Sequence, residues 1–172
     1  MRPLATRDQL EKVEDFVRSA EEEGAQLVCG GNRLEGSPYG DGFYFAPTLF
    51  ANARNDMRFC QEEIFGPVVG VIPFSSEAEV IAQANDTRFG LSAGLWTRDL
   101  DRAMRCVDAL DSGTVWVNTF RSAAMMSPVG GFKDSGYGKH NGFASIRDFS
   151  RLKNVVVDYS GQKQDAFVVK LK

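Results

Sequence analysis

Two adjacent carboxylates and a cysteine stand at the start of an apolar run, in the stretch "CQEEIFGPVVGVIPF" (60–74). Carboxylates perform general acid–base chemistry, and a cysteine thiolate can act as a nucleophile. Glu62 and Glu63 are neighbours in an extended segment, so their side chains point to opposite sides and are not expected to share one site. Composition and periodicity leave open which of the two is functional, and the alternative is a pair of solvated charges ahead of a strand.

Neither Cys60 nor His140 stands among residues that would activate it. A reactive cysteine needs nearby positive charge or a helix N-terminus, whereas Glu62 and Glu63 would raise the pKa of the Cys60 thiol. His140 is the only histidine and follows a lysine in a loop. A zinc site with two or more histidines is therefore excluded, and no CxxC pair replaces it. We predict no metal site, and an enzyme built on Cys60 or His140 is the weakest alternative.

The segment "SPVGGFKDSGYGKHNG" (127–142) is the one glycine-rich stretch with the look of a phosphate loop. Gly136, Gly138 and Gly142 almost match a dinucleotide fingerprint, but the last glycine comes one residue late and no strand leads into the motif. A P-loop also fails, because Tyr137 stands where lysine is required. We expect a loop whose glycines permit tight turns and close packing.

The bulk composition is that of an ordinary globular domain. The chain has 172 residues, 43% hydrophobic residues and a net charge of −3. That charge gives no reason to expect binding to nucleic acid or to an anionic membrane. No apolar run approaches the roughly 18 residues that a membrane span requires. The three cysteines are odd in number and far apart, which favours free thiols in a reducing, cytoplasmic compartment.

Helices are predicted where apolar residues follow a period of 3.6. The first carries an apolar stripe with Thr6 and Gln9 as a capping box at its start and Gly24 as its stop. The next two are 77–85, with Ser76 and Glu79 as a second capping box, and 100–110, capped by Asp99. Gly113 is predicted to end the latter in the C′ position. A short helix is expected over 143–149.

Strands are expected between and after these helices. The predicted strands are 25–29, 43–52, 68–74, 91–97, 114–118 and 152–159. Pro47 argues for an edge strand or an extended segment over 43–52, and the composition of 68–74 argues for a buried one. The alternation of strands and helices from 68 to 118 predicts two βαβ units. We therefore predict an α/β fold with a mainly parallel sheet.

Four stretches resemble the signature regions of the NAD(P)-dependent aldehyde dehydrogenases. They are "EEIFGPVVGVIPF", "ANDTRFGLSAGLWTRDLDRA", "SGTVWVN" and "SPVGGFKDSGYGKHNG", and they occur in the family's order. The resemblance covers nearly the whole chain, from about residue 3 to residue 159. It implies oxidation of an aldehyde to a carboxylic acid by hydride transfer to NAD or NADP. In such a reaction a cysteine thiolate attacks the aldehyde and water hydrolyses the resulting thioester.

The resemblance also implies roles for individual residues. Glu63 matches the residue that holds the nicotinamide ribose hydroxyls, and Phe65 matches the one that packs near the nicotinamide. The segment between Asn118 and Val129 matches a loop at the aldehyde entrance, so Phe120 and Val129 are expected in the substrate pocket. Val129 stands where many relatives have phenylalanine, which implies a wider or differently shaped pocket.

The same resemblance implies that the chain corresponds to the C-terminal portion of the family. The fold it implies is a three-layer open parallel sheet with flanking helices over residues 1–150. A C-terminal β-strand for subunit contact and a tail are expected over 151–172, with homo-oligomerisation through that strand. The family's nucleophilic cysteine, general-base glutamate and phosphate-binding half match nothing here. We therefore expect no activity and weak or absent NAD(P) binding by this chain alone. A non-catalytic dimerisation module is the alternative.

Overall fold

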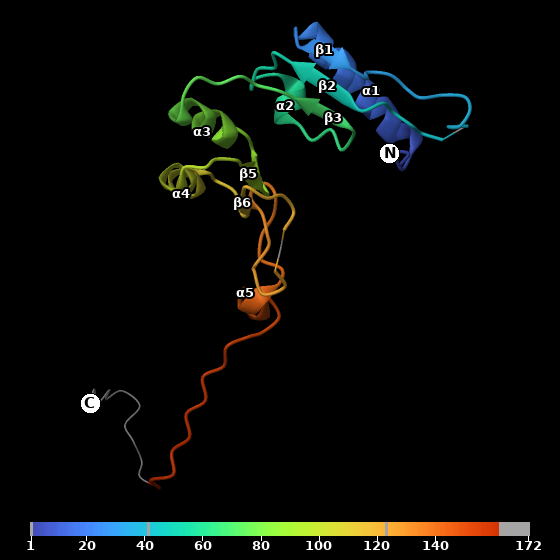
Figure 1. Ribbon diagram of the computed structural model, residues 1–172. Helices are drawn as coiled ribbons and strands as arrows, with labels where there is room; N and C mark the ends of the chain where they lie inside the picture. Colours follow the sequence, from blue (N-terminus) through green and yellow to red (C-terminus); the bar gives the residue numbers. More distant parts are fainter. Residues whose placement is uncertain (1, 41, 123, 162–172) are drawn as a thin grey trace.

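The computed structural model describes residues 2–40, 42–122 and 124–161 (Figure 1). The helices are α1 (Arg7–Glu22), α2 (Arg58–Gln61), α3 (Glu77–Asn85), α4 (Leu100–Ala109) and α5 (Gly142–Asp148). The strands are β1 (Gln26–Cys29), β2 (Thr48–Ala51), β3 (Val68–Gly70), β4 (Phe89–Gly90), β5 (Ala93–Leu95), β6 (Val115–Val117) and β7 (Phe132–Lys133). The α/β class predicted from the sequence is confirmed.

The strands form three small sheets. In the first, β2 is central, antiparallel to β1 and parallel to β3. The second is the parallel pair β5–β6, and the third is the antiparallel pair β4–β7. Of the two predicted βαβ units, only β5–α4–β6 closes within one sheet, because β3 and β5 belong to different sheets. Among the described residues, two strand pairs are therefore parallel and two are antiparallel, in three separate sheets.

Helix α1 is the best-formed element, and its predicted start and end are both confirmed. The Thr6 hydroxyl accepts a hydrogen bond from the Gln9 amide at 3.2 Å, which satisfies one of the unpaired N–H groups at the helix start. Gly24 follows the helix with φ of 92°, a left-handed conformation that glycine adopts without steric cost. The Gln9 side chain does not return to Thr6 as a capping box would. It bonds to a distant segment instead.

The hydrophobic core lies between α1 and the β1–β2–β3 sheet. Its buried members are Leu10, Val13, Phe16, Val17, Ala20, Ala25, Phe45, Phe50, Ala53, Met57 and Phe59. Beyond Ile72, which packs at the edge of this core, the buried hydrophobic residues of the described chain are Ala103 and Cys106 of α4. The burial of Cys106 agrees with its predicted place on the apolar face of its helix.

Two predictions about the first sheet are wrong. Residues 48–51 form the central strand and not an edge. Pro47 is compatible with this because it precedes the strand, where its missing N–H breaks no ladder bond. The composition of 68–74 predicts a buried strand, but the strand that forms, 68–70, is an edge strand whose Val69 is 60% exposed. Its apolar composition therefore has no cover within the described chain.

Gly113 does not end the preceding helix as predicted. Helix α4 ends at Ala109, with Leu110 as an extended C-cap. Gly113 is instead the point where the glycine-rich loop approaches the start of β6, because a Cβ there would overlap the Gly130 carbonyl. The absence of a side chain thus allows two backbones to touch.

Residues 152–159, predicted as a strand, pair with no described residue. Figure 1 shows this segment running away from α5 as an extended chain. Val155, Val156 and Val157 are 68%, 83% and 60% exposed. A strand is defined by its hydrogen-bonded neighbour, so an isolated segment of strand-forming residues stays unassigned. The rest of the predicted tail, 162–172, lies outside the described residues.

Candidate functional site

The backbone of residues 63–65, which we call the Glu63–Phe65 turn, is held by two side chains of α1. Gln9 Nε2 donates to the carbonyls of Ile64 at 2.8 Å and Phe65 at 3.1 Å. Lys12 Nζ donates to the Glu63 carbonyl at 2.7 Å. These three bonds use only backbone acceptors of the turn. They fix its position and leave the Glu63 carboxylate and the Phe65 ring available to a ligand.

The turn itself has an unusual backbone. Phe65 has φ of 56°, a left-handed conformation that costs a bulky residue about 1–3 kcal/mol and that gathers at functional sites. Gly66 follows against α1, where a Cβ would overlap the Val13 side chain. Phe65 is 75% exposed and lines a shallow cavity of about 450 Å³ with Leu4, Phe45 and Pro67.

Glu62 and Glu63 have separate environments. The Glu62 carboxylate accepts a 3.4 Å hydrogen bond from Arg58 Nε. Arg58 also donates to Asp15 at 2.8 Å and lies 4.4 Å from the centre of the Phe16 ring. Hydrogen bonds from Arg58 and then Arg18 lower the pKa of Asp15. Glu62 therefore belongs to a surface charge network, whereas no described residue forms a hydrogen bond or an ion pair with the Glu63 carboxylate.

The loop after β6 is anchored by Asn118, whose φ is 55°. Its side chain accepts from the Thr97 amide and donates to the Thr97 carbonyl, both at 2.8 Å. Trp116 Nε1 donates to the Ser122 carbonyl at 2.7 Å. The Phe120 ring meets the Trp116 ring edge-on, with centroids 5.3 Å apart, and is 63% exposed. Phe120 is thus held in an aromatic pair at the surface.

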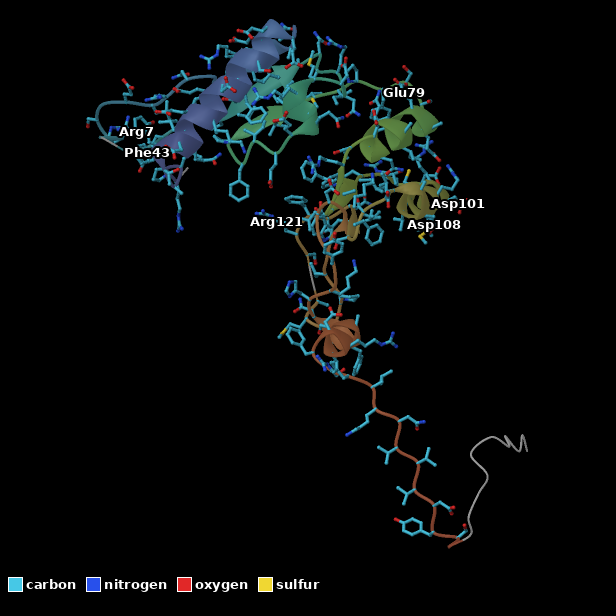
Figure 2. All side chains as sticks on the ribbon, turned by 180° about the vertical axis from the view of Figure 1, so that it is seen from behind. Arg7, Phe43, Glu79, Asp101, Asp108 and Arg121 are labelled. Carbon is cyan, nitrogen blue, oxygen red and sulfur yellow. The ribbon has the colours of Figure 1, made fainter. Side chains whose placement is uncertain are left out.

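Arg121 extends this aromatic surface. Its guanidinium lies 5.7 Å from the centre of the Phe120 ring, and its φ of 56° is again positive. Figure 2 shows Arg121 pointing away from the ribbon. Sequence reasoning did not single this residue out, because no spacing pattern marks a lone arginine in a loop.

Val129 is held through its backbone. It exchanges two 2.7 Å hydrogen bonds with His140 in an isolated antiparallel bridge, and its side chain is half-buried. The loop closed by this bridge turns at Gly136 and Gly138, with φ of 135° and 67°, as predicted for tight turns. No hydrogen bond or ring contact within the described ranges joins Phe120 or Val129 to the Glu63–Phe65 turn. The candidate residues predicted from the sequence therefore lie in two separate groups, the Glu63–Phe65 turn and the surface around Phe120 and Val129.

The cysteines and the possible metal ligands gain no functional role from the described structure. The pKa of the Cys60 thiol is raised, as expected, but the first cause is burial, followed by the charges of Glu23 and Asp56. The neighbouring glutamates, which the sequence suggested as the cause, do not contribute. All three cysteines are free, and no group of residues in the described part of the chain could hold a metal ion. None of the described helices is both long and apolar enough to cross a bilayer.

The N-terminal end of α1 carries a second recess, which no sequence pattern indicated. The Arg7 guanidinium stacks at 5.7 Å on the Phe43 ring, and Figure 2 shows the two side by side. Arg33 lines the same cavity, but its guanidinium is paired with the Glu14 carboxylate. Hydrogen bonding to Arg33 lowers the pKa of Glu14. The Arg7–Phe43 stack and the Arg33–Glu14 pair therefore hold the walls of this cavity.

The chain resembles one known protein family and several solved structures. Residues 1–155 match the model of the aldehyde dehydrogenase family. An aldehyde dehydrogenase of Mycobacterium tuberculosis, solved with NAD+, is 38% identical, with a TM-score of 0.85 over 94% of this chain and 33% of that chain. A betaine aldehyde dehydrogenase of Staphylococcus aureus with NAD+ is 34% identical, with a TM-score of 0.90 over 98% of this chain and 34% of its own.

A further solved relative has a different aldehyde in its name. An indole-3-acetaldehyde dehydrogenase of P. syringae, solved with NAD+, is 38% identical, with a TM-score of 0.83 over 88% of this chain and 30% of that one. This chain thus spans about a third of the length of the structures it matches. Identity and superposition over nearly all of its residues lead to one conclusion: the chain belongs to the aldehyde dehydrogenase family.

Proposed function

We propose that this chain supplies the nicotinamide side of the cofactor site, and part of the aldehyde entrance, of an NAD(P)-dependent aldehyde dehydrogenase. The reaction is oxidation of an aldehyde to a carboxylic acid. The observation that carries the proposal is the Glu63–Phe65 turn. Gln9 and Lys12 fix its backbone, while its carboxylate and its ring have no internal partner among the described residues.

The chemistry of the turn suits the ribose and nicotinamide of the cofactor. A carboxylate oxygen accepts hydrogen bonds, so Glu63 can bind both ribose hydroxyls at once. The exposed Phe65 ring and the apolar wall at Leu4 and Pro67 can pack against a flat nicotinamide. When bound, NAD(P)+ supplies the hydride acceptor. Phe120 and Val129, in the second group of candidate residues, would shape the approach of the aldehyde.

Catalysis by this chain alone is not expected. By resemblance none of its three cysteines occupies the catalytic motif, and the Cys60 thiol has a raised pKa. The first test is an NADH absorbance assay with several aldehydes on the purified chain, in which we expect no turnover. Clear turnover would refute this part of the proposal.

A second test measures the cofactor site directly. Isothermal titration calorimetry of NAD+ and NADP+ against the chain should give weak or undetectable binding, because only the nicotinamide end has contacts here. Micromolar affinity would mean that the site is complete and would refute the proposal of a half-site. A Glu63→Gln variant, which keeps the shape and loses the charge, should abolish any weak binding that is found. Glu62→Gln is the matched control.

A non-catalytic dimerisation module is the second candidate, and the extended segment 152–159 favours it. Its exposed valines and unpaired backbone can add a strand to the sheet edge of another copy. Light scattering over a concentration series should then show a homo-oligomer. Val156→Asp should shift the distribution to monomer, and a strict monomer at high concentration would count against the module. Free thiols throughout are consistent with a reducing, cytoplasmic location for either candidate.

A further inference from the structure

The chain exposes far more surface than a self-contained protein of its mass. Its accessible surface is 13273 Å² for a mass of 19.0 kDa, whereas a folded monomer of that mass exposes about 8,400 Å². The extended segment after α5 accounts for part of this difference. The part between Ile72 and α5 is also poorly buried, because its buried hydrophobic residues among those described are Ala103 and Cys106. Such a surface requires a large partner, of the size of an obligate interface.

The free edge of β3 is one part of this surface. The Thr48 amide donates to the Pro67 carbonyl, and the Val71 amide donates to the Phe50 carbonyl. Bonding in a parallel ladder alternates along the strand, so the backbone groups of Gly70 and Ile72 face away from β2. No described residue pairs with them. The side chain of Val69 is exposed on a face of this strand.

The free edge of β5 has the same character. The Ala93 amide donates to the Thr114 carbonyl at 2.9 Å, and the Leu95 carbonyl accepts from the backbone amide of Asn118 at 2.8 Å. By the same alternation the backbone groups of Gly94 and Trp96 face away from β6. The Trp96 side chain is 66% exposed. Two parallel pairs therefore each end in a strand with an unpaired edge, and an exposed apolar side chain lies on β3 (Val69) and directly after β5 (Trp96).

Helix α3 connects these two strands. A strand–helix–strand crossover between parallel strands returns the chain to the same sheet, next to the first strand or beyond a strand lying between the two. Here the crossover from β3 through α3 leads to β5 without joining the sheets. In Figure 1, β3 is on the side of its sheet towards β5 and β6. The crossover thus spans the width of at least one absent strand.

The superpositions on longer relatives indicate which polypeptide lies between β3 and β5. The TM-score of 0.90 covers 98% of this chain at once, so β3 and β5 have the separation that they have inside a chain about three times as long. A second copy of this chain would not impose that spacing. The polypeptide that fills it in the longer chain is the part of the relatives that this chain does not match.

We propose that the edges of β3 and β5 form one docking surface for a strand from the upstream two thirds of an aldehyde dehydrogenase polypeptide. The inserted strand joins the two parallel pairs into one sheet and covers Val69 and Trp96. This inference rests on the proposed function, since both treat the chain as one portion of such an enzyme. It goes further by naming the surface and its occupant.

The test uses the upstream two thirds of the Mycobacterium tuberculosis relative as the partner. That polypeptide is co-expressed first with its own C-terminal third, to show that it is competent, and then with the present chain. We expect a 1:1 complex in size-exclusion chromatography. Hydrogen exchange should slow at the amides of Gly70, Ile72, Gly94 and Trp96. Failure to bind a competent partner, or protection elsewhere only, would overturn the inference.

Two matched substitutions locate the surface. Val69→Asp on β3 should weaken the complex at least tenfold, because it places a charge in the new sheet. Val28→Asp on β1, the opposite edge strand of the same sheet, changes a valine of similar exposure, 54% against 60%, and should leave binding unchanged. Gly94→Pro removes the free N–H of β5 and should weaken binding as Val69→Asp does, since a Cβ at Gly94 comes no closer than 3.5 Å to another side chain.

The remaining outcomes are separable. Equal effects of Val28→Asp and Val69→Asp, or a homodimer that excludes the partner, would overturn the docking surface. A complex that forms with the expected protection but produces no NADH from aldehydes would uphold the docking inference and refute the proposed role in catalysis. Circular dichroism of each variant checks that the free chain keeps its helices.

Discussion

At the scale of single residues, the candidate cofactor site depends on side chains that touch no ligand. In the proposed site Glu63 and Phe65 would contact the cofactor, while Gln9 and Lys12 hold the backbone that presents them. A single glutamine amide group supplies two hydrogen bonds, which no hydroxyl or carboxylate could donate. The sequence placed Gln9 in a capping box three residues after Thr6, and only the backbone half of that prediction is confirmed.

Gln9→Ala should therefore destabilise the Glu63–Phe65 turn. Loss of two partly exposed hydrogen bonds is expected to cost about 1–2 kcal/mol in the free energy of unfolding, measured by urea titration. Hydrogen exchange within residues 62–67 should also become faster. Glu21→Ala on the same helix, whose side chain has no hydrogen bond to a described residue, is the control. Equal stability of the two variants would show that Gln9 does not hold the turn.

At the scale of elements, two segments come into backbone contact where a glycine has no side chain. The 127–142 loop reaches the start of β6 at Gly113 and Gly130, and the Val129–His140 bridge closes it. This contact positions Val129, so the shape of the predicted aldehyde entrance depends on a glycine outside the 127–142 loop. The sequence marked Gly113 as a helix stop because spacing after a helix is a local signal, whereas close approach is not.

Gly113→Ala should displace the loop. Its Cβ would overlap the Gly130 carbonyl, and backbone cannot yield as a flexible side chain can, so we expect a loss of about 1–3 kcal/mol. Gly94→Ala is the matched control, because its Cβ has room and should be close to neutral. Thermal unfolding followed by circular dichroism gives the comparison. If the two variants melt at the same temperature, the proposed contact is not rigid.

At the scale of the whole molecule, packing is uneven along the chain. The core from Leu10 to Phe59 joins α1 to the first sheet, while the described residues after Ile72 bury few apolar side chains. Local stability follows buried apolar contacts. The first part should therefore hold its structure independently, and the second should depend on a partner.

Hydrogen exchange of the free chain tests whether its two parts differ in stability. Amides of α1 and β2 should exchange slowly, and those of α4, β5 and β6 should exchange much faster, as two separate groups with different opening free energies. Addition of the upstream partner polypeptide should slow the second group. Equal protection of α1 and α4 in the free chain would instead mean one cooperative unit, and would contradict the idea of a dependent second part.

The sequence by itself determined the local elements and the family. Periodicity and caps located α1, α3 and α4, because a helix closes its hydrogen bonds within a few residues. The motif around Glu63 indicated the aldehyde dehydrogenases, because it occurs with three other motifs of the family in the family's order. Tertiary structure alone decided that β2 is central, that β3 is an exposed edge, and that α1 holds the Glu63–Phe65 turn. Those outcomes depend on contacts between residues about twenty to fifty-six positions apart, which no local pattern records.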